Sequence, residues 1–142
     1  MTRVSYLVYR LERHIRAQLD EALTGLGISV TEYMTLSELR LRDGLSSSQL
    51  ARIAFVTPQA MNLVIRDLEQ RELIRRTEDL TRGRVLRTSL TRKGLATLRR
   101  CDRALDGIEE SMLVEMDDAT RKALAESLTD CVHALRARTS GT

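Results

Sequence analysis

The sequence predicts a mainly α-helical fold that contains one small β-hairpin. Three observations lead to this prediction. Apolar residues recur at helical spacing along most of the chain, a run of β-favouring residues interrupts them once after residue 72, and good helix caps mark the segment boundaries. With 142 residues, of which 42% are hydrophobic and 30% charged, the chain has the length and composition of one globular domain.

A long first helix is predicted over residues 3–24. Its apolar residues alternate at spacings of four and three, with charged residues between them. The stripe consists of Val4, Val8, Leu11, Ile15, Leu19 and Ala22. The glycine-containing segment GLGIS at residues 25–29 ends this helix.

Two shorter helices follow. Thr31 is a suitable N-cap for the second helix, and the Asp43-Gly44 pair is a stop signal for it. Its inner face carries Tyr33, Leu36 and Leu39. The third helix opens with SSSQ at residues 46–49, which has the spacing of a capping box. It turns Leu50, Ile53 and Ala54 inward.

A fourth helix begins at Pro58, after the tight connection FVTP at residues 55–58. Thr57 caps it, and a proline at the first helical position loses no hydrogen bond. Its inner face carries Met61, Val64, Ile65 and Leu68, and its outer face carries Gln59, Asn62 and Arg66. The fourth helix is therefore amphipathic, with an outer face that is polar but not acidic.

The hairpin is predicted from two β-favouring runs, residues 73–77 and 85–90, which flank a polar segment with a glycine at residues 78–84. Thr91 then caps a fifth helix. Its apolar residues are Leu95, Leu98, Cys101, Leu105, Ile108 and Met112. After MDDAT at residues 116–120, a sixth helix carries Leu124, Leu128, Cys131 and Leu135.

Positive charge is concentrated around the hairpin. The formal net charge is +3, but residues 71–100 alone hold ten basic and three acidic side chains. A basic segment in an otherwise balanced chain indicates a surface that faces a polyanion, although many charged runs are simply solvated.

Two short helices joined by a tight turn, followed directly by a hairpin, predict a winged helix-turn-helix. Gln and Asn can bond bidentately to adenine in the major groove, Arg can do so to guanine, and Leu63 could contact a thymine methyl. The residues of the fourth helix expected at DNA are Thr57, Pro58, Gln59, Asn62, Leu63 and Arg66. The alternative is that this outer face is merely solvated; the basic hairpin, with Arg82, Arg84 and Arg87, favours DNA.

With these motifs the sequence resembles the multiple antibiotic resistance regulator (MarR) family of bacterial winged-helix transcription factors. The resemblance lies in SSSQLARIAFVTPQAMNLVIRDLEQRELIRR at residues 46–76 and in the wing RGRVLRTSLTRKG at residues 82–94. The wing ends in the family's L-T-x-x-G motif at Leu90, Thr91 and Gly94. The order of elements agrees with the family over essentially the whole chain.

The resemblance implies a single domain over residues 1–142, with DNA bound by residues 31–91 and dimerisation through residues 1–28 and 92–138. It implies an obligate homodimer, which also fits apolar stripes that one small domain cannot cover. The dimerisation residues would be Val4, Val8, Leu11, Ile15, Leu124, Leu128 and Leu135. Two recognition helices in successive major grooves would read a near-palindromic operator with half-sites about ten base pairs apart.

The resemblance also implies a repressor that is released by a small aromatic or carboxylate-bearing effector. A cytoplasmic location is expected separately, because the N-terminal segment MTRVSYLVYR is too interrupted by arginine for a signal peptide. The DNA site would include Ser46, Ser47 and Ser48 at the start of the third helix, and Arg82, Gly83, Arg84 and Arg87 in the wing. One departure matters. The family's wing usually carries Asp-x-Arg, and here Arg84 matches the arginine while Arg82 replaces the aspartate. We expect a more positive tip, unless Asp79 supplies the missing partner.

Other classes of function find less support. An enzyme is not expected, because the chain has no glycine-rich phosphate loop and no nucleophile with an identifiable histidine partner. No metal or other cofactor is expected, since zinc-binding patterns such as C-x-x-C are missing, and no apolar run is long enough to cross a membrane.

Two alternatives stay open: a winged-helix interaction protein that does not read DNA, and a redox-responsive regulator that uses Cys101 and Cys131. Both cysteines lie on apolar stripes, so buried structural roles are expected for them.

Overall fold

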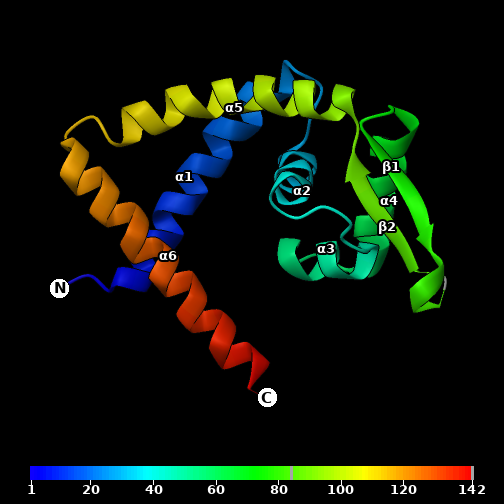
Figure 1. Cartoon of the computed structure of the whole chain (residues 1–142). Helices are drawn as coiled ribbons and strands as arrows, with labels where there is room; N and C mark the ends of the chain where they lie inside the picture. Colours follow the sequence, from blue (N-terminus) through cyan, green and yellow to red (C-terminus); the bar gives the residue numbers. More distant parts are fainter. Residues whose placement is uncertain (84, 142) are drawn as a thin grey trace. The chain divides into compact units, whose positions relative to one another are not determined.

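The computed structural model describes residues 1–83 and 85–141, and Figure 1 shows the order of the elements. They are α1 (Val4–Thr24), α2 (Val30–Leu41), α3 (Ser47–Ala54), α4 (Pro58–Gln70), β1 (Ile74–Asp79), the short 3-10 helix η1 (Leu80–Arg82), β2 (Val85–Leu90), α5 (Arg92–Met112) and α6 (Asp118–Ser140). The predicted mainly α-helical class with a hairpin wing is confirmed. The chain packs as two compact units, Met1–Ile108 and Glu109–Thr142.

The helix starts follow their capping residues, with one correction. Thr31 does not cap α2, because Ser29 does: its hydroxyl accepts from the Glu32 backbone N–H, and the Glu32 carboxylate accepts from the Ser29 N–H. This reciprocal pair satisfies two backbone donors, whereas a lone threonine satisfies one. The predicted capping box of Ser46 and Gln49 and the predicted Thr57 cap are both present.

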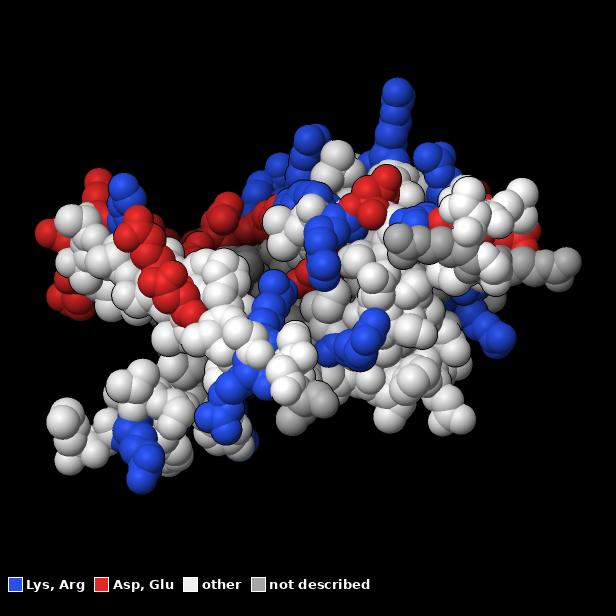
Figure 2. All heavy atoms as spheres, turned by 60° about the horizontal axis from the view of Figure 1, so that its bottom comes forward, with Lys and Arg blue, Asp and Glu red and all other residues white. Residues whose placement is uncertain are grey.

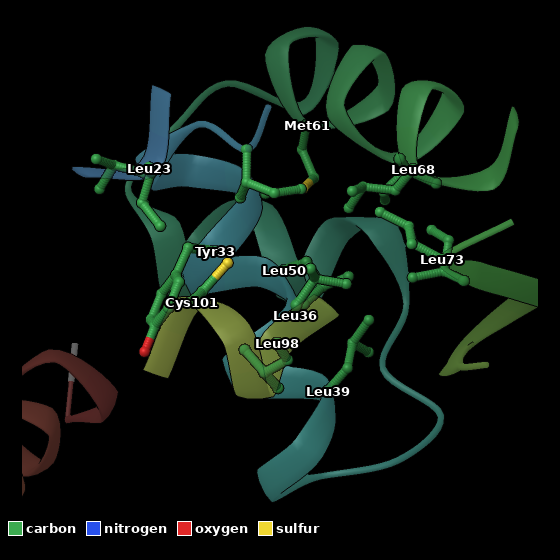
Figure 3. Packing of buried hydrophobic residues seen from close by; sticks show 14 of the residues in the cluster. Leu23, Tyr33, Leu36, Leu39, Leu50, Met61, Leu68, Leu73, Leu98 and Cys101 are labelled. Carbon is green, nitrogen blue, oxygen red and sulfur yellow. The ribbon is translucent and has the colours of Figure 1, made fainter. Parts of the chain in front are cut away.

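The core of the first unit lies between the helix-turn-helix and the start of α5 (Figure 3). Leu36 of α2, Leu50 of α3, Met61 and Leu68 of α4, and Leu98 of α5 are all fully buried. Helix α1 contributes only its C-terminal end to this core, through Leu19 and Leu23. Val4, Val8 and Leu11 of the α1 stripe are exposed, whereas Ile15 and Ala22 are half-buried.

The wing is a two-stranded antiparallel hairpin whose register runs from Ile74 opposite Leu90 to Asp79 opposite Val85. A single β-bridge between Leu45 and Thr88 attaches β2 to the loop that precedes α3. Because of this bridge, the base of the wing is tied directly to the helix-turn-helix.

The start of α5 sits tightly against the backbone just before β1. The Thr91 hydroxyl accepts from the Gly94 N–H at 3.0 Å and donates to the Glu72 carbonyl at 2.6 Å. A Cβ added to Gly94 would lie 2.0 Å from the Leu73 carbonyl oxygen, so no side chain fits there. The L-T-x-x-G motif thus has a structural reason: its threonine caps α5 and its glycine allows the close approach.

A polar contact joins α2 to α5. The Asp102 carboxylate accepts from the Tyr33 hydroxyl and from the Arg40 guanidinium. The arginine, more than the tyrosine, lowers the pKa of Asp102, so the carboxylate stays ionised over a wide pH range. Helix α2 is thereby linked to α5 by a charge-assisted hydrogen bond.

In the second unit, α6 begins at the N-cap Asp117, whose side chain accepts from the Thr120 N–H. Arg121 donates to both carboxylate oxygens of Glu110, which holds the start of α6 to the end of α5. Among its described residues α6 buries none, so its apolar stripe also lacks cover within the chain. None of the described helices is long and apolar enough to span a membrane.

Candidate nucleic-acid interface

Helices α3 and α4 form the predicted helix-turn-helix, and α4 presents its polar side outward. Met61, Ile65 and Leu68 are buried against the core, which fixes the rotation of α4 about its axis. Gln59, Asn62 and Arg66 are exposed on the other side, and the Leu63 side chain beside them is 68% exposed. Exposed apolar and amide groups on one helix face are suited to thymine methyls and adenine edges.

Asn62 is held by a contact that the sequence alone does not reveal. The Ser47 hydroxyl donates to Asn62 Oδ1 at 2.7 Å, across the junction of α3 and α4. An amide oxygen has two lone pairs, so Asn62 keeps one acceptor site and both N–H donors for a base. The other two serines differ: Ser46 is used in the capping box, and Ser48 is exposed.

Arg71 anchors the C-terminal end of α4. Its guanidinium donates to Glu32 at 3.1 Å, to Asp67 at 3.1 Å and to the carbonyl of Gly27 at 2.8 Å. These bonds connect α4 to the loop before α2. With the Thr57 cap at one end and Arg71 at the other, α4 is fixed at both ends.

The wing tip carries its own network of hydrogen bonds, centred on Asp79. The Asp79 carboxylate accepts from the Thr81 hydroxyl at 2.6 Å and from Arg87 Nε at 2.6 Å, and these two bonds lower its pKa to about 2. Arg87 also donates to the Gly44 carbonyl at 3.4 Å. Asp79 therefore has Arg87 as its arginine partner, and Arg87 braces the wing against the loop before α3.

Two predicted wing residues lie wholly or partly outside the described residues. Arg84 is outside them, and only the backbone of Arg82, in η1, is described. Gly83 has a left-handed backbone with φ 65, which a glycine adopts without strain. The DNA contacts of the wing arginines remain predictions.

The basic segment after residue 70 is partly neutralised by the fold. Arg76 pairs with Glu69 at 3.3 Å, Arg87 pairs with Asp79, and Arg71 pairs with Glu32 and Asp67. Counting charges along the sequence overstates the positive surface, because these arginines bridge elements of the protein itself.

The helix-turn-helix as far as residue 66 differs in charge from the rest of the chain, and Asp67 and Glu69 follow only at the C-terminal end of α4. Residues 46–66 contain Arg52 and Arg66 but no Asp or Glu, although the chain holds 20 acidic residues. Figure 2 turns the lower side of Figure 1 forward and shows Lys and Arg side chains around a largely uncharged surface. A polyanion approaching the helix-turn-helix therefore meets no carboxylate on residues 46–66.

The predicted dimerisation residues are mostly exposed in the single chain. Val4 is 74% exposed and Leu135 is 66% exposed, and Val8, Leu11 and Leu128 are exposed to lesser degrees. Ile15 and Leu124 are half-buried. Such apolar faces on two long helices are typical of an interface with another chain.

The two cysteines differ, which corrects the expectation that both are buried. Cys101 is fully buried in the core, and burial raises the pKa of its thiol, so it stays protonated and unreactive. Cys131 is exposed on α6, because nothing in the described chain packs on that face. Among the described residues, no group of His, Cys, Asp and Glu side chains is arranged to hold a metal ion.

Comparison with known proteins gives consistent matches. A sequence model described as "MarR family" matches residues 26–84. The HTH-type transcriptional repressor Rv2887 of Mycobacterium tuberculosis (strain H37Rv) is 36% identical over 113 residues, which cover 80% of this chain and 81% of that protein.

Solved structures of Rv2887 resemble this chain closely. Its complex with salicylic acid superposes with a TM-score of 0.76 at 32% identity, covering 92% of this chain and 97% of that one. Its complex with DNA gives a TM-score of 0.76 at 30% identity, covering 92% and 98%.

Proposed function

The chain belongs to the MarR family, and from that premise we propose that it is a homodimeric transcriptional repressor that binds a near-palindromic DNA operator and leaves it when a small aromatic carboxylate binds. One observation supports DNA binding most directly. The outer face of α4 carries Gln59, Asn62 and Arg66 on a helix fixed at both ends, and residues 46–66 around them contain no acidic residue. Their donors and acceptors match those of base edges in the major groove.

The proposed dimer follows from the uncovered faces of α1 and α6. A two-fold axis pairs the same surface on both chains, so the exposed stripes of one chain would be covered by those of the other. The same axis duplicates α4 and the wing. Two α4 helices in successive major grooves of one duplex face would require half-sites about ten base pairs apart.

Asn62 and Arg84 are assigned different tasks, which can be separated by experiment. Arg84→Ala is expected to weaken binding to every duplex and to reduce the salt dependence by about 0.9 log units per log salt, because one phosphate contact is lost.

Asn62→Ala is expected to weaken the free energy of DNA binding by about 1–3 kcal/mol, and only on the duplex that the wild type selects from a random-sequence pool. Fluorescence anisotropy titrations at several salt concentrations measure both quantities.

Arg136→Ala is the matched control, since it removes one exposed positive charge from α6 and is expected to leave the salt slope unchanged. An Arg84→Ala slope equal to that of the wild type contradicts the role of the wing. A loss for Asn62→Ala that is equally large on random DNA contradicts base reading by Asn62. A wild type whose affinity is indifferent to salt points to the interaction protein without DNA readout.

Release by an effector is the second part of the proposal. It is supported by the related Rv2887, which has been solved with salicylic acid and with p-aminosalicylic acid. Salicylate titrated into the protein–DNA complex is expected to weaken the apparent DNA affinity by about 5–150-fold, the usual range of coupling between two sites. Salicylamide, which keeps the ring but not the carboxylate, is the control and is expected to have a smaller effect. A DNA affinity that stays constant across the salicylate titration rejects this effector class and leaves DNA binding intact.

A further inference from the structure

Phe55, the only phenylalanine in the chain, occupies an unusual backbone position. It follows α3 as the C-cap residue, with φ 55 and ψ 40 in the left-handed region. Its N–H bonds back to the Arg52 carbonyl at 3.3 Å, which closes the last turn of the helix. Glycine is the usual residue here, because a Cβ in the left-handed conformation crowds the following carbonyl oxygen.

Packing within the protein does not explain the phenylalanine. The Phe55 residue is 95% exposed, whereas its neighbours Ala54 and Val56 are partly buried against the core. The ring thus gains nothing from the fold, and the backbone beneath it is strained. A strained backbone that brings no packing benefit in the free protein indicates that the residue contacts a binding partner.

The surroundings of Phe55 indicate what the ring would contact. Phe55 lies two residues before Thr57, which caps the N-terminus of α4, the end of a recognition helix that reaches base edges. It lies within residues 46–66, where Arg52 and Arg66 are the only charged residues. An apolar ring within a segment that carries two arginines and no carboxylate suits a partner that is anionic overall and offers apolar groups. Duplex DNA has both, since its phosphates flank thymine methyls and deoxyribose carbons.

We propose that Phe55 is a DNA-contacting residue whose ring packs against the apolar groups of the duplex, a thymine methyl or a deoxyribose, where α4 enters the major groove. The proposal rests on the proposed DNA-binding function and adds to it a contact made from the turn instead of from α4 itself. The strained turn is then retained because a glycine would remove the contact.

Phe55→Gly separates this role from a structural one, because the two predict opposite signs. On the wild-type-selected duplex, the variant is expected to bind about tenfold more weakly, which is the loss of a small apolar contact. Its thermal unfolding midpoint, measured without DNA, is expected to equal or exceed that of the wild type, because glycine relieves the left-handed strain. Phe55→Asn, which also tolerates this conformation, is expected to show the same weaker binding.

A uracil-substituted duplex distinguishes a contact with a thymine methyl from a contact with a deoxyribose. Uracil lacks the thymine methyl, so replacing thymine by uracil costs affinity wherever a methyl is contacted. If Phe55 contacts a methyl, this cost is smaller for Phe55→Gly than for the wild type; if it contacts a deoxyribose, the cost is the same for both. Leu41→Asn is the matched control, since Leu41 is 75% exposed at the end of α2, and its loss is expected to leave DNA affinity unchanged.

Phe55→Gly protein that binds the selected duplex as tightly as the wild type overturns the proposal. A Phe55→Gly variant that binds weakly and also unfolds at a lower temperature overturns it as well, because Phe55 then supports the fold. These outcomes differ from a failure of the proposed function, in which the wild type itself binds none of the duplexes.

Discussion

Gly94→Ala is expected to lower the free energy of unfolding by about 3 kcal/mol, the upper end of the usual cost of overpacking. The reason is the 2.0 Å separation between the position of an added Cβ and the Leu73 carbonyl oxygen. That oxygen belongs to the backbone and accepts from the Thr91 N–H at 3.2 Å, so it cannot move without breaking this bond. The start of α5 would be pushed away from the segment that leads into β1. Thermal and chemical denaturation at a fixed protein concentration measure the change.

Gly107→Ala on the same helix is the matched control. A Cβ added to Gly107 meets no heavy atom within 4 Å in the chain. Because alanine favours helix over glycine by about 1 kcal/mol, this variant is expected to be as stable as the wild type or more so. If both variants have similar stability, the close approach of Gly94 to the Leu73 carbonyl is not present in solution.

Leu128→Glu is expected to abolish the dimer. Leu128 lies on the apolar stripe of α6, and a carboxylate buried there without a partner costs several kcal/mol. A two-fold interface contains the substitution twice, so association is expected to weaken by at least about 4 kcal/mol, or about a thousandfold. Leu11→Glu is expected to have the same effect from α1. Sedimentation equilibrium measures the dissociation constant directly.

Thr129→Glu places the same charge one residue further along α6, turned by about 100° around the helix axis. This control is expected to remain a dimer. A wild type that sediments as a stable folded monomer, or Leu11→Glu and Leu128→Glu variants that dimerise normally, would show that the stripes are not an interface.

The elements of the fold could be predicted because local signals agreed with each other. Helical spacing, the caps at Ser46 and Thr57, and the β-favouring runs predict boundaries close to those of the structure, although the first strand is predicted over residues 73–77 and is observed over Ile74–Asp79. The N-cap of α2 is the exception: Thr31 is the predicted cap, although Ser29 and Glu32 have the spacing of a capping box and form one in the structure.

The details of the candidate interface depend on contacts between residues that are distant in sequence. The Ser47–Asn62 bond and the Arg76–Glu69 and Arg87–Asp79 pairs each join separate elements, so no local pattern indicates them. The left-handed conformation of Phe55 was equally hidden, because the turn FVTP contains no glycine that would mark it. Exposure at Cys131 could not be foreseen either, since an apolar stripe looks the same whether its cover comes from its own chain or from another.

The contrast between the two thiols has a practical consequence. A maleimide dye that reacts with exposed thiols would attach to Cys131 and spare Cys101, so the unaltered protein accepts a single label on α6. Because Cys131 shares the stripe of Leu128 and Leu135, the proposed pairing of chains would shield it from the reagent. The rate of labelling at increasing dilution would then follow the separation of the subunits, without any engineered cysteine.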